Sequence, residues 1–215
     1  MINRILQILF FALFIKPLIL IIIGLNCRFR DKLPKSGPAV IAANHNSHLD
    51  TFVLMCLYPL SEIHRLRPVA AADYFMRGGL LGWFSLTIMR IIPIDRKNCK
   101  SRKEMFQSCH DALDNGDILI LFPEGTRGEP EKQGELKKGI YHLIRNRSDT
   151  EVTPIVMHGL GRSLPRGEAL FIPFNCDVVI GDSLAVTDSA QELLEKLSAS
   201  YEELKTHCIT RVHDS

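Results

Sequence analysis

Residues 118–127 read ILILFPEGTR, a run of aliphatic side chains followed by a turn that contains proline and glycine. A short, continuous apolar run of this kind is typical of a strand buried on both faces. The turn places a carboxylate, Glu124, and a guanidinium, Arg127, where the strand ends. Guanidinium groups bind phosphate, and carboxylates accept hydrogen bonds from hydroxyls. Taken alone, however, the turn is more typical of a surface loop with an ion pair worth under about 1 kcal/mol.

Residues 44–50, NHNSHLD, form a second polar motif directly after the apolar run of residues 40–43. Removing a proton from a hydroxyl requires a base, and histidine titrates closest to neutral pH. A carboxylate on the other ring nitrogen fixes the tautomer and stabilises the imidazolium. We therefore predict His45 as a base and Asp50 as its partner. This pairing requires His45 to lie on the turn after a strand and Asp50 in the first turn of the next helix.

Two alternative roles for residues of this motif stay open. Residues 47–50, SHLD, fit a capping box in which Asp50 only bonds the start of a helix. For the segment in isolation, capping is the more common role. His48 is a second candidate base, but it lies two residues from Asp50, and side chains at that spacing do not meet on a helix.

Short apolar runs alternate with helical patterns along the rest of the chain. Strands are predicted at residues 40–43, 68–71, 91–94, 118–122, 152–157 and 178–180, and helices from about residue 47, at 101–113, after 139 and at 188–209. This alternation indicates an α/β structure with the sheet between helices. Asp95 and Arg96 follow one predicted strand, and strand ends line the ligand crevice of α/β sheets.

The N-terminal segment, residues 5–25, is almost wholly apolar and long enough to span a bilayer. Lys16 and Pro17 interrupt it: a lysine at the bilayer centre costs about 2.5–3.5 kcal/mol, and proline removes a helix hydrogen bond. The segment is a strained transmembrane helix, two short helices broken near Lys16-Pro17 and embedded in one leaflet, or a signal peptide. No small-x-small cleavage site supports the last of these. We favour the leaflet-embedded form.

The domain organisation follows from this segment. We predict a membrane anchor at residues 1–33 and one globular domain at residues 34–215, joined through the turn-forming PKSGP of residues 34–38. Basic residues (Arg28, Arg30, Lys32 and Lys35) cluster after the apolar segment, which predicts that the domain faces the cytoplasm.

Composition and missing motifs exclude several functions. The net charge of +2, without a basic tract interleaved with aromatics, argues against nucleic acid. The six cysteines include no C-x-x-C pair, which argues against a metal site and favours free thiols in a reducing compartment. The chain has no G-x-S-x-G elbow, P-loop or complete G-x-G-x-x-G. We therefore expect a substrate hydroxyl to react directly once a base has activated it, without a covalent enzyme intermediate.

With these motifs in place, the chain resembles the lysophospholipid acyltransferases of the 1-acylglycerol-3-phosphate acyltransferase family. The four ordered blocks of that family have counterparts at residues 44–50, 92–96, 122–127 and 153–156, and the third, FPEGTR, matches letter for letter. The resemblance spans roughly residues 35–185. It implies an α/β fold with a central mixed sheet flanked by helices, preceded by an N-terminal hydrophobic helical anchor.

The resemblance also implies roles for individual residues. His45 corresponds to the base of the family and Asp50 to its partner. The residues implied to hold the acceptor are Arg96, Glu124, Gly125, Thr126 and Arg127. The implied reaction moves a fatty acyl group from acyl-CoA or acyl-ACP (acyl carrier protein) to a lysophospholipid hydroxyl, most simply converting 1-acylglycerol 3-phosphate to phosphatidic acid. It needs no cofactor or metal and takes place at a membrane surface, with the domain on the cytoplasmic side of a bacterial inner membrane.

Three alternative functions are consistent with parts of the sequence. The same chemistry on a different acceptor, such as a lyso-ornithine lipid, depends on residues 162–173, which match no common block of the family. A catalytically silent, membrane-anchored lipid-binding protein would bind lipid without consuming thioester. A thioesterase would release thiol without any lysolipid.

Overall fold

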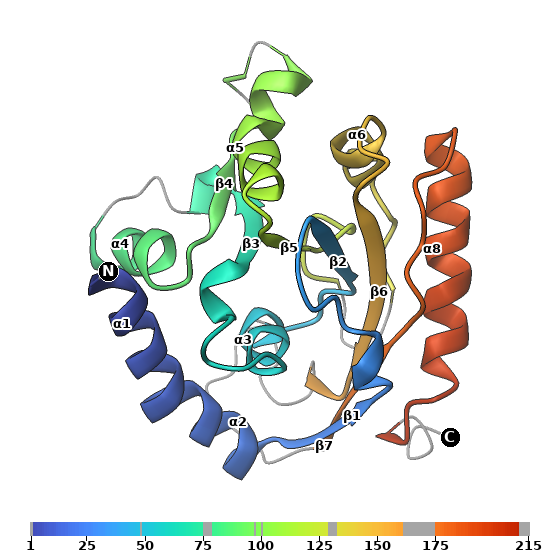
Figure 1. Cartoon of the computed structure of the whole chain (residues 1–215). Coiled ribbons are helices and arrows are strands. Elements are labelled where there is room, and N and C mark those ends of the chain that lie inside the picture. Colours follow the sequence, from blue (N-terminus) through green and yellow to red (C-terminus); the bar gives the residue numbers. More distant parts are fainter. Residues whose placement is uncertain are drawn as a thin grey trace.

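The computed structural model describes residues 2–47, 49–74, 79–96, 98–99, 101–128, 133–160 and 175–210. His48, the second candidate base, and residues 162–173, which bear on the choice of acceptor, lie outside the described residues. Within these ranges the chain forms one seven-stranded sheet with helices on both faces (Figure 1). The predicted α/β fold with a central mixed sheet is confirmed.

The strands are β1 (Gly24–Arg28), β2 (Ala39–Ala43), β3 (Leu66–Ala71), β4 (Ile92–Ile94), β5 (Ile118–Leu121), β6 (Glu151–His158) and β7 (Asn175–Ile180). Their order across the sheet is β1-β7-β6-β2-β5-β3-β4. All neighbouring pairs are parallel except β6 and β7, which are antiparallel. Five strands, β2 to β6, therefore run in one direction and end at the same edge.

The α-helices are α1 (Ile2–Phe10), α2 (Lys16–Ile22), α3 (Asp50–Cys56), α4 (Gly79–Thr87), α5 (Arg102–Asp114), α6 (Gly139–Ile144) and α8 (Ala190–Lys205). Three 3-10 turns lie at Arg30–Lys32, Ile63–Arg65 and Ala72–Tyr74. Helices α1, α2 and α3 cover one face of the sheet, while α5, α6 and α8 cover the other (Figure 1).

Strand β2 shows why the central strands are continuously apolar. Ile41 and Ala43 pack into the core beneath α1 to α3, whereas Val40 and Ala42 pack into the core beneath α5, α6 and α8. Because both faces are buried, a polar residue on either face would lose its water without gaining a partner. The apolar runs in the sequence result from this two-sided burial.

Helix boundaries follow their capping residues. The Oγ atoms of Ser101 and Ser189 accept the N–H of Glu104 at 3.2 Å and of Glu192 at 3.1 Å, which starts α5 and α8. Gly116, at φ +73°, follows α5, so the predicted stop signal is confirmed. The last helix is shorter than expected, because it ends at Lys205 and not at residue 209.

The N-terminal segment differs from our expectation in two ways. Lys16-Pro17 does not break the helix: residues Phe11–Ile15 form a π-helix, and the N–H of Lys16 donates to the carbonyl of Phe11, five residues earlier. The wider turn accommodates the proline without ending the helix. Residues 24–28, which we assigned to the anchor at 1–33, form strand β1, which pairs with β7 at the sheet edge. The apolar run continues to Ile23, and Gly24, at the start of β1, is the residue there that signals the end of the helix.

Candidate active site

Three of the sequence motifs come together at the edge of the sheet where β2 to β6 end. Residues 44–49, hereafter the His45 loop, follow β2. Residues 122–128 follow β5, the neighbour of β2, and Asp95-Arg96 follow β4. The carboxyl ends of parallel strands form the usual ligand crevice of α/β folds. Topology alone therefore places motifs nearly eighty residues apart in one region.

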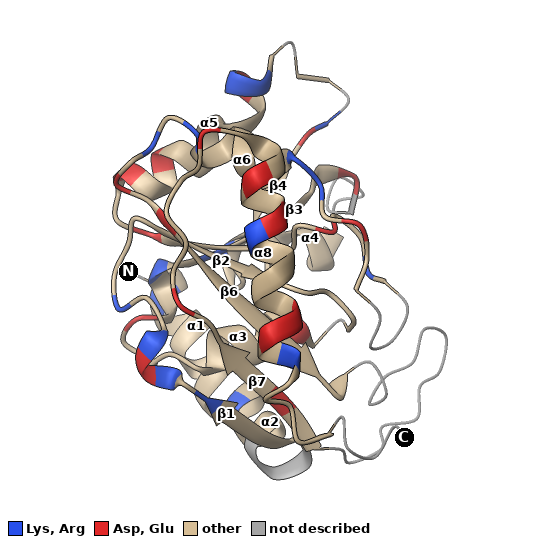
Figure 2. Ribbon diagram, turned by 90° about the vertical axis from the view of Figure 1, so that its right-hand side faces the viewer, with Lys and Arg blue, Asp and Glu red and all other residues tan. Residues whose placement is uncertain are grey.

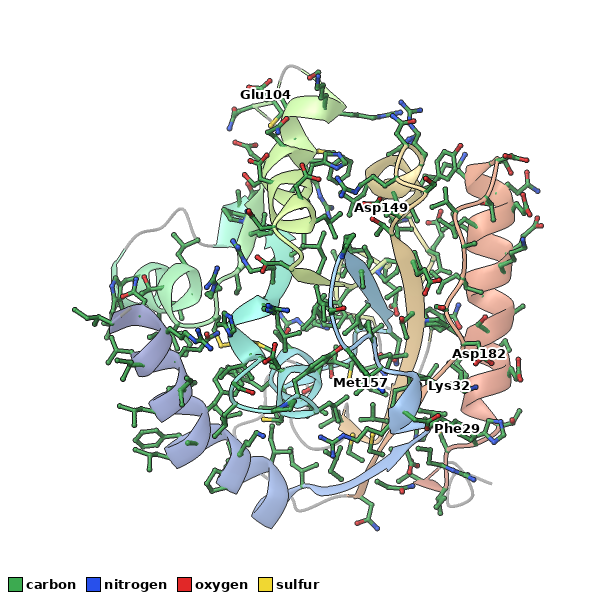
Figure 3. All side chains as sticks on the ribbon, in the orientation of Figure 1. Phe29, Lys32, Glu104, Asp149, Met157 and Asp182 are labelled. Atoms are coloured by element: carbon green, nitrogen blue, oxygen red, sulfur yellow. The ribbon has the colours of Figure 1, made fainter. Side chains whose placement is uncertain are left out.

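Asn44 fixes the beginning of the His45 loop to strand β6. Its Nδ2 donates to the carbonyl of Met157 at 2.8 Å, and its Oδ1 accepts the N–H of the same residue at 2.7 Å. The buried amide thus continues the β2–β6 ladder by one step beyond the last paired backbone groups. Figure 3 labels Met157 on β6 at this position. We predicted no role for Asn44, although a buried asparagine at a strand end needs partners of this kind.

His45 and Asp50 form the expected pair. The distance between Nδ1 of His45 and Oδ2 of Asp50 is 2.8 Å, and Asp50 is fully buried, whereas the side chain of His45 is 20% exposed. Oδ2 of Asp50 also accepts the N–H groups of Asn46 at 2.7 Å and Ser47 at 2.9 Å. One oxygen of Asp50 therefore contacts the histidine and also holds the backbone of the loop that precedes α3.

This geometry defines what the imidazole can do. When Nδ1 carries the proton donated to Asp50, the neutral ring presents the lone pair of Nε2. The ring also stacks on Phe122, with centroids 4.1 Å apart and planes inclined by 19°. Its orientation is therefore set by a carboxylate on one edge and by an aromatic ring on one face. A partly exposed, oriented imidazole is suited to accept a proton from a substrate hydroxyl.

Glu124 is buried against backbone N–H groups. It is 4% exposed, its Oε1 accepts the N–H of His45 at 3.2 Å, and its Oε2 accepts the N–H of Gly134 at 3.1 Å. Burial raises the pKa of Glu124, and the two N–H donors oppose that rise. We expected this carboxylate to bind an acceptor hydroxyl. The structure shows that it also joins the turn after β5 to the His45 loop.

The carbonyl of His45 is held by the same turn. It accepts the N–H of Gly128 at 3.0 Å. Both backbone groups of His45 are thus bonded to residues 124–128, so the two most specific motifs form one hydrogen-bonded unit. Because the contact with Glu124 spans 79 residues of sequence, no local pattern could have revealed it.

Cationic side chains gather around the turn at Gly125. This glycine has φ +76°, a conformation that disfavours other residues, and a Cβ there would lie 3.6 Å from Nη1 and Nη2 of Arg96. The backbone of Lys137 donates to the carbonyl of Pro123 at 2.8 Å, and its side chain passes near the same turn. The half-buried Arg127 and the exposed Thr126 complete the turn. The structure therefore brings the predicted residues Arg96, Gly125, Thr126 and Arg127 together at the turn that is bonded to the His45 loop.

The described residues offer no metal centre, since no group of three His, Cys, Asp or Glu side chains within them is arranged to hold an ion. A histidine–carboxylate pair beside a cationic turn, at the strand ends of an α/β sheet, suits an enzyme that deprotonates a hydroxyl of an anionic substrate.

Comparison with known proteins narrows this class of enzyme. The family model described as Acyltransferase matches residues 24–158, more than half of the chain, and the chain belongs to this family.

Several relatives share one name. The chain is 28% identical over 158 residues to the chloroplastic 1-acyl-sn-glycerol-3-phosphate acyltransferase of Arabidopsis thaliana, covering 73% of this chain and 42% of the relative. The chain is 30% identical over 166 residues to a 1-acyl-sn-glycerol-3-phosphate acyltransferase of Chlamydomonas reinhardtii, covering 75% of this chain and 47% of the relative. It is 28% identical to the 1-acyl-sn-glycerol-3-phosphate acyltransferase of Pseudomonas aeruginosa, covering 75% of this chain and 60% of the relative. The match thus spans about half the length of these relatives.

The fold is shared with a solved structure. The crystal structure of the 1-acyl-sn-glycerophosphate acyltransferase PlsC from Thermotoga maritima superposes with a TM-score of 0.73 at 18% identity, covering 94% of this chain and 81% of the other. At this identity the likeness establishes the fold. Strand β1 falls within the family match, which supports its place in the domain and not in the anchor.

Proposed function

We propose that this protein is a membrane-associated O-acyltransferase that moves a fatty acyl group from acyl-CoA or acyl-ACP to the hydroxyl of a lysophospholipid. The simplest acceptor is 1-acylglycerol 3-phosphate, and the product is then phosphatidic acid. The observation that carries the proposal is the 2.8 Å contact between His45 and the buried Asp50, located beside a cationic turn. The family match and the names of the relatives support it.

The proposed reaction is a single transfer. Nε2 of His45 takes the proton from the acceptor hydroxyl as its oxygen attacks the thioester carbonyl. Asp50 stabilises the resulting imidazolium through Nδ1. When the tetrahedral intermediate collapses, the C–S bond breaks, and the imidazolium returns the proton to the departing thiolate. The products are an ester and a free thiol, and His45 is neutral again.

We propose that the guanidinium groups of Arg96 and Arg127 hold the phosphate of the acceptor. Arginine pairs with phosphate through two parallel hydrogen bonds, which also orients the ligand. Gly125 leaves room for Arg96 to approach the turn, and Thr126 offers an exposed hydroxyl beside it. In this proposal Glu124 acts through His45 and does not touch the acceptor.

Membrane attachment is proposed through the N-terminal helix. Residues Ile2–Ile19 are long and apolar enough to cross a membrane, a property that core helices and signal sequences share. One side of this helix packs against the domain through Phe11, Ile15 and Ile19, and Lys16 Nζ donates to the carbonyl of Tyr58 at 3.1 Å. A helix docked lengthwise on a globular domain cannot leave it to span a bilayer without exposing this core. We therefore propose attachment within one leaflet.

The basic residues that follow the helix also contact the domain. Lys32 forms a 2.8 Å ion pair with Asp182, and Figure 3 shows the two labelled residues side by side. Arg28 donates to the carbonyl of His207 at 2.9 Å. These contacts hold the segment that follows the helix on the domain. The positive charge of the two residues supports the proposed cytoplasmic side of a bacterial inner membrane.

An acceptor panel tests the proposal. The purified protein, reconstituted in vesicles, receives a long-chain acyl-CoA or acyl-ACP and one of several lysolipids, and mass spectrometry identifies the product lipid. The proposal predicts phosphatidic acid from 1-acylglycerol 3-phosphate at the highest rate. A preference for a phosphate-free acceptor such as a lyso-ornithine lipid would overturn the role given to Arg127. Lipid binding without any product would identify a silent lipid-binding protein.

A further inference from the structure

Helices α1 and α4 enclose an exposed apolar groove. Its volume is about 840 Å³, and its nine lining residues are all aliphatic or aromatic. The ring of Phe10 on α1 meets that of Phe84 on α4 edge-on, with centroids 5.0 Å apart, and this contact joins the two helices. We name the outward apolar side chains of residues 2–14 and 79–88 the α1–α4 face.

The side chains of the α1–α4 face are unusually exposed for apolar residues. Leu80 is 81% exposed, Phe14 63% and Trp83 50%. Isolated exposed apolar residues are ordinary, but a contiguous group of them marks an interaction surface. Helix α4 therefore cannot be explained as a core element, and its sequence, GLLGWFSLT, has no polar side for solvent beyond one serine and one threonine.

The charged residues around the α1–α4 face indicate whether a protein or lipid covers it. Residues 2–22 and 79–88 contain no Asp or Glu, and their only charged residues are Arg4 and Lys16. Both cations donate to carbonyls of the domain: Arg4 Nη2 to Ser61 at 3.2 Å, and Lys16 Nζ to Tyr58 at 3.1 Å. No acidic group therefore borders the groove on either helix. Protein interfaces normally carry a polar rim and hydrogen bonds, whereas lipid chains offer neither.

We propose that α4 is a second membrane-inserting element, which enters the same leaflet as α1 and places Trp83 at the interface between head groups and acyl chains. Tryptophan concentrates at this depth because its ring is apolar and its N–H remains hydrated. The inference rests on the proposed membrane attachment but assigns it to a segment within the acyltransferase domain. Helix α4 precedes β4, whose end bears Arg96, so insertion would hold this edge of the site close to the lipid surface.

The opposite helix layer provides the contrast. Helix α8 presents acidic and basic residues to solvent (Figure 2), including the ion pair of Lys196 with Glu192 at 2.8 Å. It lies on the other face of the sheet from α1. A molecule that is apolar on one side and charged on the other has a defined orientation at a bilayer.

Trp83 is the only tryptophan of the chain, so its fluorescence reports on α4 alone. The full-length protein is bound to vesicles of phosphatidylethanolamine and phosphatidylglycerol whose acyl chains are brominated either near the head group or near the bilayer centre. The expected result is strong quenching by the shallow bromines and weaker quenching by the deep ones. Unchanged Trp83 emission in brominated vesicles that carry the bound protein would overturn the proposal.

A matched reference places the probe on the other side of the molecule. Glu195→Trp in a Trp83→Phe background puts the single tryptophan on the exposed side of α8, where bromines should not quench it. Quenching at both positions would show non-specific adsorption and overturn the proposal. A blue shift of Trp83 that depends on protein concentration in dispersed protein, without quenching by lipid, would show that a second copy covers the face and would equally overturn it.

A functional variant separates this inference from the proposed function. Leu80→Asp with Leu81→Asp places charges where the wild-type side chains are exposed, so folding is retained, and vesicle binding is expected to fall about tenfold or more. Transfer to a short-chain acceptor dispersed as monomers should stay unchanged. Unaltered vesicle binding would overturn the inference. If Trp83 is quenched but no acyl transfer occurs, the proposed function fails and the inference stands.

Discussion

The His45 loop and the α1–α4 face are built from opposite kinds of interaction. In the loop, directional hydrogen bonds that involve Asn44, Asp50 and Glu124 hold the polar groups at distances between 2.7 and 3.2 Å. On the face, nine apolar side chains line a groove and contribute area instead of directional bonds. Chemistry needs a base placed within fractions of an ångström, whereas attachment to lipid needs only area. Single substitutions should therefore act steeply in the loop and gradually on the face.

The steepest effect is expected at Asp50. Asp50→Asn keeps the size of the side chain but removes the charge and one acceptor, so the imidazole loses the group that fixes its tautomer. We expect kcat to fall by about 10²–10⁴-fold. Steady-state kinetics measure the loss, and circular dichroism confirms that the variant is folded. A decrease below about threefold would contradict the partnership between His45 and Asp50.

Glu124→Gln tests whether this carboxylate positions His45 or binds the acceptor. The variant turns one acceptor oxygen into a donor, which leaves the N–H of His45 or of Gly134 without its partner. Since a displacement of about 1 Å can cost about 10²-fold, we expect kcat to fall by roughly 10- to 100-fold with little change in the KM for lysolipid. Glu135→Gln, on the exposed carboxylate beside Lys137, is the control. A raised KM with unaltered kcat would instead restore the acceptor-binding role.

Substitutions of the arginines at the cationic turn should change KM, whereas those at Asp50 and Glu124 should change kcat. A hydrogen bond to a charged group contributes about 1.5–3 kcal/mol, so Arg127→Ala or Arg96→Ala should raise the KM for 1-acylglycerol 3-phosphate about tenfold or more. The KM for the thioester should be little affected. Lys196→Ala on α8 removes a cation far from the site and serves as the control. Equal changes in the two KM values would show a general loss of structure and not a lost phosphate contact.

The sequence predicted most where residues obey a local rule. Strand β5 is continuously apolar because it is buried on both faces, and Asp50 pairs with His45 as the motif predicts, so pattern and structure agree there. The contacts of Glu124 with two backbone N–H groups could not be predicted, because only the fold brings these groups close to it. Helix α4 was not predicted, since it is apolar on all sides and a pattern without a polar face gives no periodic signal.

A smaller effect is expected in the pH dependence of stability. Burial raises the pKa of Glu124, so this group contributes stability below its unfolded pKa, near 4.5, which is lost as the pH rises through the higher folded value. Glu124→Gln cannot ionise and lacks this dependence. The melting temperature of the variant relative to wild type should therefore increase between pH 4 and pH 7. A difference that stays constant across this range would show that the carboxylate is not desolvated.

The smallest effect on folding is expected on the α1–α4 face. Leu80→Ala should change the free energy of unfolding by less than about 0.5 kcal/mol, because the side chain is exposed. The same truncation at Leu54, which is fully buried in α3, should cost about 2–5 kcal/mol. Denaturation of both variants under one set of conditions measures the contrast. A large loss for Leu80→Ala would mean that the face is part of the core.

The proposed mechanism depends above all on His45 activating an acceptor hydroxyl for direct attack on a thioester. The decisive experiment is thiol release from a long-chain acyl-CoA or acyl-ACP, with and without 1-acylglycerol 3-phosphate, by wild type and His45→Ala. We expect release that requires the lysolipid and falls by about 10²–10⁴-fold in the variant. Release by wild type without any lysolipid would identify a thioesterase, and full activity in His45→Ala would contradict the assignment of the base.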